Sequence, residues 1–298
     1  MLLLLLGICA SIIALVAHLR SRRHTTAELL ARLPWDDAII LSIDFAALRR
    51  ADVLQVLAAP VDIQEPEYRA FVMDTGFDYL EDLDFALVSF HGDDWFFLLR
   101  GRFNWKKVGE YVVRQGGSCY NSFCQLAGST PERKISLLPL LPDLMGLAIG
   151  KDEWLADRLK VRQAGRPLSA LPARPVWSVV PASVLKKTEA LPPVLAAFAK
   201  TLESAESVVL ALGLQADGME ALLESTCRSP GEAASLASQL QTATSLLRER
   251  MARENRQPDP RDLTGPLAAG VFRQQDSRVF GRWLIKWAFF EALAGGPR

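Results

Sequence analysis

The chain has 298 residues, a formal net charge of zero and a pI of about 6.8. Half of the residues are hydrophobic, which excludes a largely disordered protein, and the balanced charge offers no basic face, so we expect no nucleic-acid partner. This length suits one large domain or two small ones.

The first predicted element is an apolar segment at the N-terminus. Residues 2–19 carry no Asp, Glu, Lys or Arg and include eleven Leu, Ile or Val residues. As a helix they would span about 27 Å, close to the thickness of a bilayer core. We expect a transmembrane anchor over residues 1–19 and a polar tether over residues 20–36, with a cleaved signal peptide or lipidation of Cys9 as alternatives.

Two features bear on the orientation of this anchor. Arg20, Arg22 and Arg23 follow the apolar segment, and basic residues favour the cytoplasmic side. Cys119 and Cys124 flank a predicted turn at a spacing suited to a disulfide, which persists only in an oxidising compartment. We predict a single-pass protein of the bacterial inner membrane with a periplasmic body. A cytoplasmic body is the alternative that the arginines favour.

Short strands and helices alternate in the first part of the body. A strand over residues 38–44 is followed by a helix that Pro60 ends and by a second helix over residues 65–73. A strand–turn–strand–helix unit comes next, and more strands and a helix complete this part. The unit covers residues 85–90, 91–94, 95–99 and 105–113, and the later elements cover residues 134–138, 144–149 and 152–159.

The same strand–turn–strand–helix order occurs again in the second part. Its helix has a clear start, because Ser229 and Glu232 form a capping box and Pro230 occupies the first helical position. The strands and turn of this unit cover residues 207–214, 216–218 and 219–227, and later elements cover residues 269–273, 278–285 and 288–293.

The order of elements therefore predicts an α+β fold. We expect two related strand–strand–helix repeats that form mainly antiparallel sheets with helices packed on one face, preceded by one transmembrane helix. Residues 37–165 would form the first repeat domain, residues 166–176 a proline-rich linker, and residues 177–298 the second repeat domain.

A catalytic interpretation has few candidates. Asp44 follows a strand, and His91, Asp93 and Asp94 form a cluster that could transfer protons. The sequence His91-Gly-Asp-Asp94 between two apolar segments is, however, typical of a hairpin turn. No nucleophile motif, glycine-rich phosphate loop or metal-ligand spacing accompanies it, so we predict no catalytic, cofactor-binding or metal-binding residue.

Two pairs of residues are candidates for an interaction surface. Arg100 and Arg102 flank a glycine and could bind an anionic group, although such alternation is also typical of a solvated strand face. Trp283 and Trp287 lie among aromatic and basic residues that could meet a membrane interface, or they could pack in the core.

Several short segments resemble those of uncharacterised membrane-anchored bacterial proteins of unknown function. The resemblance covers most of the body and implies a location in the bacterial envelope, but it carries over no functional residue. The segments are residues 74–78, 83–84, 100–103, 270–272 and 281–283.

These observations favour a non-enzymatic envelope protein. We expect it to be held in the membrane by its N-terminal helix and to bind another envelope or membrane protein as an accessory or scaffold subunit, without a cofactor. A membrane-tethered hydrolase and a carrier of a small molecule or lipid are the alternatives; the carrier would need a sizeable enclosed cavity.

Overall fold

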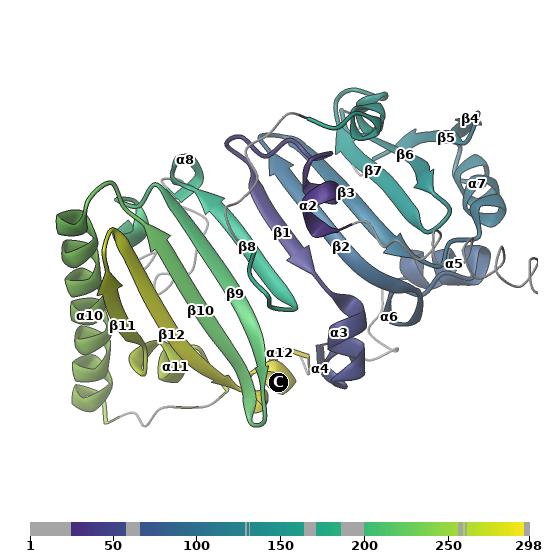
Figure 1. The fold of residues 1–298 in the computed structure, drawn as a ribbon. Helices are drawn as coiled ribbons and strands as arrows, with labels where there is room; N and C mark the ends of the chain where they lie inside the picture. The colour runs from purple at the N-terminus through teal and green to yellow at the C-terminus, as the bar shows by residue number, and fades with distance from the viewer. Residues whose placement is uncertain are drawn as a thin grey trace, which may run out of the picture.

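The computed structural model describes residues 25–57, residues 66–163 apart from 129 and 131, residues 171–185, 200–255, 259 and 261–294 (Figure 1). The predicted anchor over residues 1–19 lies outside these ranges. Within them, no helix combines the length and the apolar character needed to cross a bilayer.

The strands of the described residues form a single twelve-stranded sheet in which every neighbouring pair is antiparallel. The antiparallel α+β class is therefore confirmed, whereas the expectation of more than one sheet is wrong.

The strands of the sheet lie side by side in the order β11, β12, β10, β9, β8, β1, β2, β3, β7, β6, β5 and β4. Their bounds are β1 Ile39–Ile43, β2 Leu83–His91, β3 Asp94–Gly101, β4 Ser118–Tyr120, β5 Phe123–Ala127, β6 Lys134–Leu141, β7 Leu144–Gly150, β8 Val176–Pro181, β9 Ser207–Gln215, β10 Gly218–Thr226, β11 Val271–Gln275 and β12 Arg278–Lys286.

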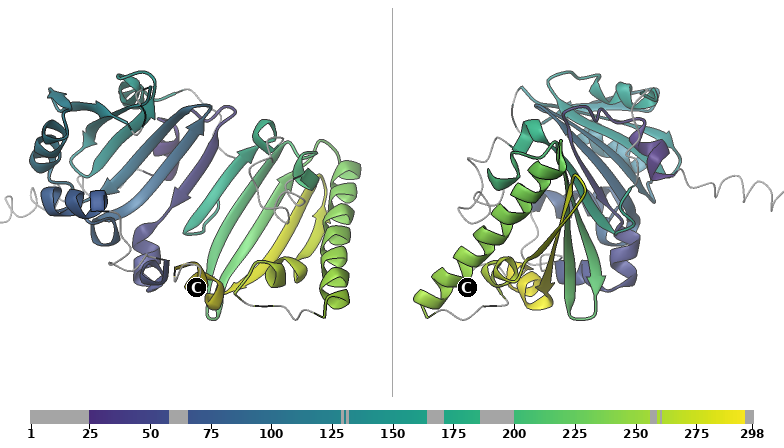
Figure 2. Two further views of the ribbon diagram at one scale, coloured as in Figure 1. Left: turned by 180° about the vertical axis from the view of Figure 1, so that it is seen from behind. Right: turned by 60° about the vertical axis from the view of Figure 1, so that its left-hand side comes forward.

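The strand order is mirrored about the centre of the sheet (Figures 1 and 2). From β1 outward the first half runs β2, β3, β7 and β6, and from β8 outward the second half runs β9, β10, β12 and β11. Among the described strands, the first half alone continues further, into β5 and β4. The two halves join where β1 pairs with β8, with Ile40 opposite Val179 and Ser42 opposite Trp177.

Eleven helical segments of the described residues surround this sheet. The predicted helix after β1 is divided in two, because Asp52 adopts a left-handed φ of 58° between the two parts. The bounds are α2 Thr26–Leu30, α3 Phe45–Arg50, α4 Val53–Leu57, α5 Pro66–Thr75, α6 Tyr79–Asp82, α7 Trp105–Arg114, the 3-10 helix η2 Leu155–Lys160, α8 Ala182–Leu185, α10 Pro230–Arg253, α11 Thr264–Ala268 and α12 Trp287–Ala294.

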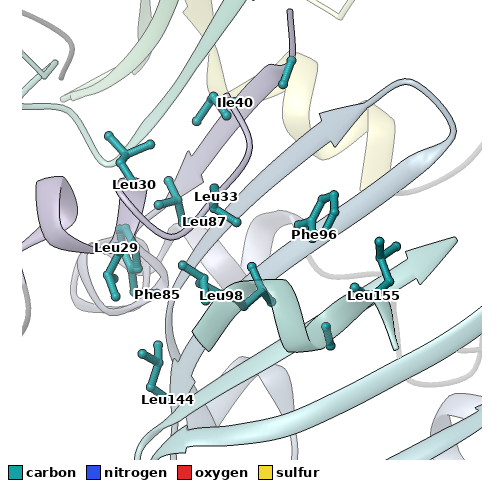
Figure 3. Close-up of a cluster of buried hydrophobic side chains, with 14 of the residues drawn as sticks. Leu29, Leu30, Leu33, Ile40, Phe85, Leu87, Phe96, Leu98, Leu144 and Leu155 are labelled. Atoms are coloured by element: carbon teal, nitrogen blue, oxygen red, sulfur yellow. The ribbon is translucent and has the colours of Figure 1, made fainter. Parts of the chain in front are cut away.

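One face of the sheet, called here the α2 face, carries the largest core cluster (Figure 3). Leu29, Leu30 and Leu33 of the α2 segment pack there, together with buried residues of η2. Their partners on the strands are the side chains that alternate toward this face, including Phe85, Leu87, Phe96, Leu98 and Leu144. Residues 26–30 thus form a helix within the segment predicted as a tether.

The opposite face, called the α10 face, is covered by other helices. In the first half, Val108 and Val112 of α7 pack against Leu137 and Met145. In the second half, α10 packs on the sheet through a stripe that includes Leu236. The right-hand view of Figure 2 shows α10 and α2 on opposite sides of the sheet. The prediction that helices pack on one face is therefore wrong.

The reason is visible in the strands themselves. Leu98 packs in the cluster on the α2 face, while its neighbour Leu99 packs with α7 on the other face. Successive side chains of a strand point to opposite faces, so a strand with consecutive apolar residues needs cover on both.

The predicted helix starts are confirmed by their hydrogen bonds. The Asn104 side chain accepts a hydrogen bond from the backbone N–H of Lys107 at 3.2 Å, and the Ser229 hydroxyl accepts one from Glu232 at the same distance. These bonds satisfy N–H groups that the first turn of a helix leaves without partners. Both helices therefore begin where the sequence predicts. Only one bond of the predicted capping box forms, because the Glu232 carboxylate accepts from the backbone N–H of Arg228 rather than from that of Ser229.

Candidate functional site

The structure does not bring the four hydrolase candidates together. His91, Asp93 and Asp94 lie at the β2–β3 turn, where the left-handed Gly92 reverses the chain. Asp44 lies beyond the opposite end of the β1–β2 pair, about 20 Å away, because a strand rises by about 3.3 Å per residue. Its side chain caps α3 by accepting a hydrogen bond from the backbone N–H of Ala47 at 2.7 Å. No shared catalytic site is built from these residues.

Arg100 and Arg102 lie near the end of β3. The guanidinium of Arg100 lies over the ring of Phe85 at 5.0 Å. Arg102 pairs with Asp82 at 2.9 Å and also donates to the carbonyl of Glu81. Both side chains therefore hold the first half together locally.

Trp283 and Trp287 lie far from these arginines, because five strands separate β12 from β3. Trp283 packs edge to face against Phe272 at 5.3 Å on the α10 face. Trp287 begins α12, and its indole N–H donates to the carbonyl of Ala216 at 3.2 Å. The four candidates for an interaction surface do not share one patch.

The predicted disulfide between Cys119 and Cys124 is confirmed, and it joins β4 to β5 at the sheet edge. Cys227 is a buried free thiol. Burial raises the pKa of Cys227, and the nearby carboxylates of Glu232 and Glu206 raise it further. The thiolate is therefore disfavoured at neutral pH, which makes Cys227 a poor nucleophile.

No group of three or more His, Cys, Asp or Glu side chains in the described ranges is arranged to hold a metal ion. The arrangement with the clearest capacity for binding lies elsewhere, on the α2 face of the second half. We call it the open face, because no helix of the described residues packs on it as α2 and η2 do in the first half. Its side chains are Val209 and Ala211 of β9, Glu220, Leu222 and Glu224 of β10, Val271 and Arg273 of β11, and Arg278, Phe280 and Arg282 of β12.

A groove of about 780 Å³ runs over the open face. Its floor includes Val209, Leu222 and Phe280, and residues 171–174 line one side. A second hollow of about 340 Å³ shares Pro172, Ala173 and Arg174 with it and continues toward α2. The second hollow also contains Asp44, so this residue lies at the margin of the groove system.

Charged pairs cross the open face. The carboxylate of Glu220 is buried and bridges two arginines, Arg174 at 3.2 Å and Arg282. Arg278 pairs with Glu224 at 2.9 Å. The guanidinium of Arg273 lies over the ring of Phe280 at 5.1 Å. The open face therefore carries four arginines and only two carboxylates, those of Glu220 and Glu224, so positive charge is in excess above the apolar floor of the groove.

Gly213 makes the position of Arg174 possible. It lies opposite Glu220 in the β9–β10 register, and a Cβ atom at Gly213 would come within 2.6 Å of the Arg174 guanidinium. The missing side chain lets Arg174 lie against the sheet and reach the carboxylate.

Glu220 and Arg174 were not among the residues predicted from the sequence. One signal was present, because Glu220 and Glu224 are four residues apart on β10, as are Arg278 and Arg282 on β12. Residues spaced by an even number share a face of a strand, so this pattern predicts two charged rows. Arg174 carried no such signal, since it precedes β8 and reaches Glu220 only through the folded sheet.

No protein-family model and no curated protein matches the chain. A solved structure of TP0453, in crystal form III, is similar with a TM-score of 0.53 and 10% sequence identity, over 92% of this chain and 98% of that one. Crystal form IV of the same protein gives a TM-score of 0.49 at 10% identity, over 90% and 95% of the two chains. At this identity the likeness to crystal form III shows the fold alone.

Proposed function

We propose that this protein is a non-enzymatic, membrane-anchored binding protein of the bacterial envelope. Its open face would receive an acidic amphipathic segment of a partner protein. The observation that carries this proposal is the groove on the open face, where four arginines and two glutamates surround an apolar floor.

Charge complementarity defines the partner segment. An amphipathic helix with leucines on one side would cover Val209, Leu222 and Phe280, and acidic residues at its margins would meet Arg273 and Arg278. Both arginines are exposed and can reorient toward a ligand.

The first half supports the fit of a helix on this surface. There the same face of the sheet is covered by α2, whose segment contributes Leu29, Leu30 and Leu33 to the core. The strand order of the second half mirrors that of the first, but no described helix takes the corresponding place. A partner segment on the open face would supply equivalent cover.

The anchoring part of the proposal rests on residues 2–19, which are long and apolar enough to cross a bilayer. The disulfide between Cys119 and Cys124 supports a body in an oxidising compartment. Together they favour a periplasmic body held at the inner membrane.

A binding measurement with the full chain in detergent tests the partner chemistry. The probe is a synthetic helical peptide with leucines on one side and glutamates on the other, compared with a peptide that has lysines in place of the glutamates. We expect the acidic peptide to bind and the basic one not to bind. Arg278→Glu should weaken binding about tenfold or more.

Arg250→Glu is the matched control. Arg250 pairs with Glu254 at 2.9 Å, the same distance as the pair of Arg278 with Glu224, but it lies on α10 away from the open face. Equal binding of the two peptides, or an equal effect of the two substitutions, would contradict the proposed site.

The alternatives receive less support. The hydrolase interpretation depends on four side chains that lie at two ends of the β1–β2 pair. A carrier would enclose its ligand, whereas the groove is bordered by the exposed residues Val271, Arg273 and Arg282.

A further inference from the structure

The chain enters the described body at a defined place. Thr25 caps α2, whose side chains pack on the α2 face of the first half. The preceding 24 residues contain the apolar segment 2–19, and only a short stretch separates it from Thr25. An extended chain spans at most about 3.5 Å per residue, so residues 20–24 can separate the apolar segment from Thr25 by no more than about 17 Å. Any bilayer that holds the apolar segment therefore lies close to α2.

The 3-10 helix η2 lies beside α2 at this place. The guanidinium of Arg32 donates hydrogen bonds to the carbonyls of Leu159 and Lys160, both at 3.1 Å. The backbone N–H of Gln163 donates to the carbonyl of Ala31 at 2.5 Å. The two helical segments thus form one layer over the sheet, which we call the α2–η2 layer: residues 25–33 and 151–163.

The outer side of this layer carries exposed apolar side chains. Trp154 is 52% exposed and Val161 is 66% exposed. Trp154 stacks on the ring of Phe123 with centroids 5.0 Å apart, and about half of the residue remains exposed. Tyr120, opposite Phe123 in the β4–β5 register, is 76% exposed. Exposed aromatic residues of this kind gather where proteins meet membrane interfaces.

Several basic side chains lie near these residues. Lys151, Arg158, Lys160 and Arg162 are exposed within one short segment. Burial lowers the pKa of Arg32, the positive charge of Arg162 lowers it further, and the carboxylate of Glu28 partly opposes this shift. In the sequence, Arg20, Arg22 and Arg23 directly precede this layer. Within the layer, five basic side chains (Arg32, Lys151, Arg158, Lys160 and Arg162) face four carboxylates (Glu28, Asp152, Glu153 and Asp157), so one positive charge remains in excess there.

We propose that the α2–η2 layer lies on the surface of the membrane that holds residues 2–19, with Trp154 and Val161 in the headgroup region and Lys160 and Arg162 beside anionic phospholipid headgroups. This inference rests on the membrane-anchoring part of the proposed function. The occupant is the bilayer itself, because the anchor tethers this layer within reach of it, and aromatic and basic side chains suit its interface.

The open face remains separate from this contact. Neighbouring strands in a sheet rotate by roughly 20° relative to one another. The open face is centred on β10, several strands away from β2, β3 and β7 beneath the layer. The rotation that accumulates over these strands therefore turns the open face out of the plane of the proposed membrane contact.

The test uses the full chain in vesicles of phosphatidylcholine mixed with phosphatidylglycerol. A Cys9→Ala background removes the thiol in the anchor, and Trp154→Cys carries an environment-sensitive fluorophore. Leu246→Cys is the matched control, since Leu246 is 55% exposed on α10, which packs on the opposite face. We expect lipids bearing nitroxide groups to remove most emission at position 154 and none at position 246.

Charge variants sharpen the result. Lys160→Glu with Arg162→Glu should reduce the quenching at position 154, as should vesicles of phosphatidylcholine alone, whereas Arg250→Glu with Arg253→Glu should not. Equal emission at positions 154 and 246 in protein that floats with the vesicles would overturn this inference and leave the anchor intact. Protein that does not float with the vesicles would overturn the anchoring, and this inference with it.

Discussion

The two halves of the sheet share a strand order but differ in what covers the α2 face. In the first half the strands present Leu87, Phe96 and Leu98, and the α2–η2 layer buries them. In the second half, β10 presents Glu220 and Glu224, and its neighbour β12 presents Arg278 and Arg282 beside them. Strand order therefore sets where the faces lie, while the side chains at alternate positions decide which face the described helices cover.

The largest expected effect compares two residues at equivalent positions on corresponding strands, Leu98 on β3 and Leu222 on β10. Leu98→Ala removes a fully buried side chain in the first half and should lower the free energy of unfolding by about 2–5 kcal/mol. Leu222→Ala removes a partly buried side chain on the open face and should cost about 1 kcal/mol. Denaturant unfolding in detergent measures both, and equal losses would show that the open face is as well packed as the first half.

The next effect concerns the extension that only the first half has. The disulfide closes a loop with a sequence separation of five, and its loss should lower the free energy of unfolding by about 2 kcal/mol. Cys119→Ser with Cys124→Ser, and reduction of the unchanged chain, should give the same shift in denaturant unfolding. If a reductant destabilised the double variant as well, the shift could not be assigned to this bond.

The smallest expected effect concerns a feature that both halves share, a side-chain cap at the start of the helix that follows a hairpin. Asn104→Ala and Ser229→Ala each remove the side-chain cap of the helix that follows a hairpin, and each should cost about 1 kcal/mol. Asn104→Asp and Ser229→Asp keep an acceptor and serve as controls in the same unfolding experiment. A loss in only one half would mean that the two helix starts are not equivalent.

Local elements of this fold are readable from the sequence because their causes are local. Pro230 and the Ser229 cap start α10 where predicted, and the hairpin turn at residues 91–94 joins β2 to β3. Strand β8 was not predicted as a strand, because it follows a proline-rich segment and gains its partners from β1 and β9, distant in the chain. The joining of both halves into one sheet depends on that strand.

The candidate site was less predictable for the same physical reason. The salt bridge between Arg174 and Glu220 joins residues 46 positions apart, and neither residue carries a local motif. The sequence left two interpretations of Trp283, an interaction surface or the core, and it packs with Phe272 and neighbours of α10, since alternation along β12 directs it to the α10 face. Which face an aromatic residue meets follows from strand register, which a single strand does not specify.

The pairing of β1 with β8 has a consequence for dissecting the molecule. Each of these strands lies in the interior of the sheet only because the other half supplies its neighbour. A fragment that ended between them would present a row of unpaired backbone groups, and such an edge invites pairing with any available strand, including another copy of the fragment. Each half thus shields the other from self-association, and shortened versions of the chain should be chosen to keep both strands.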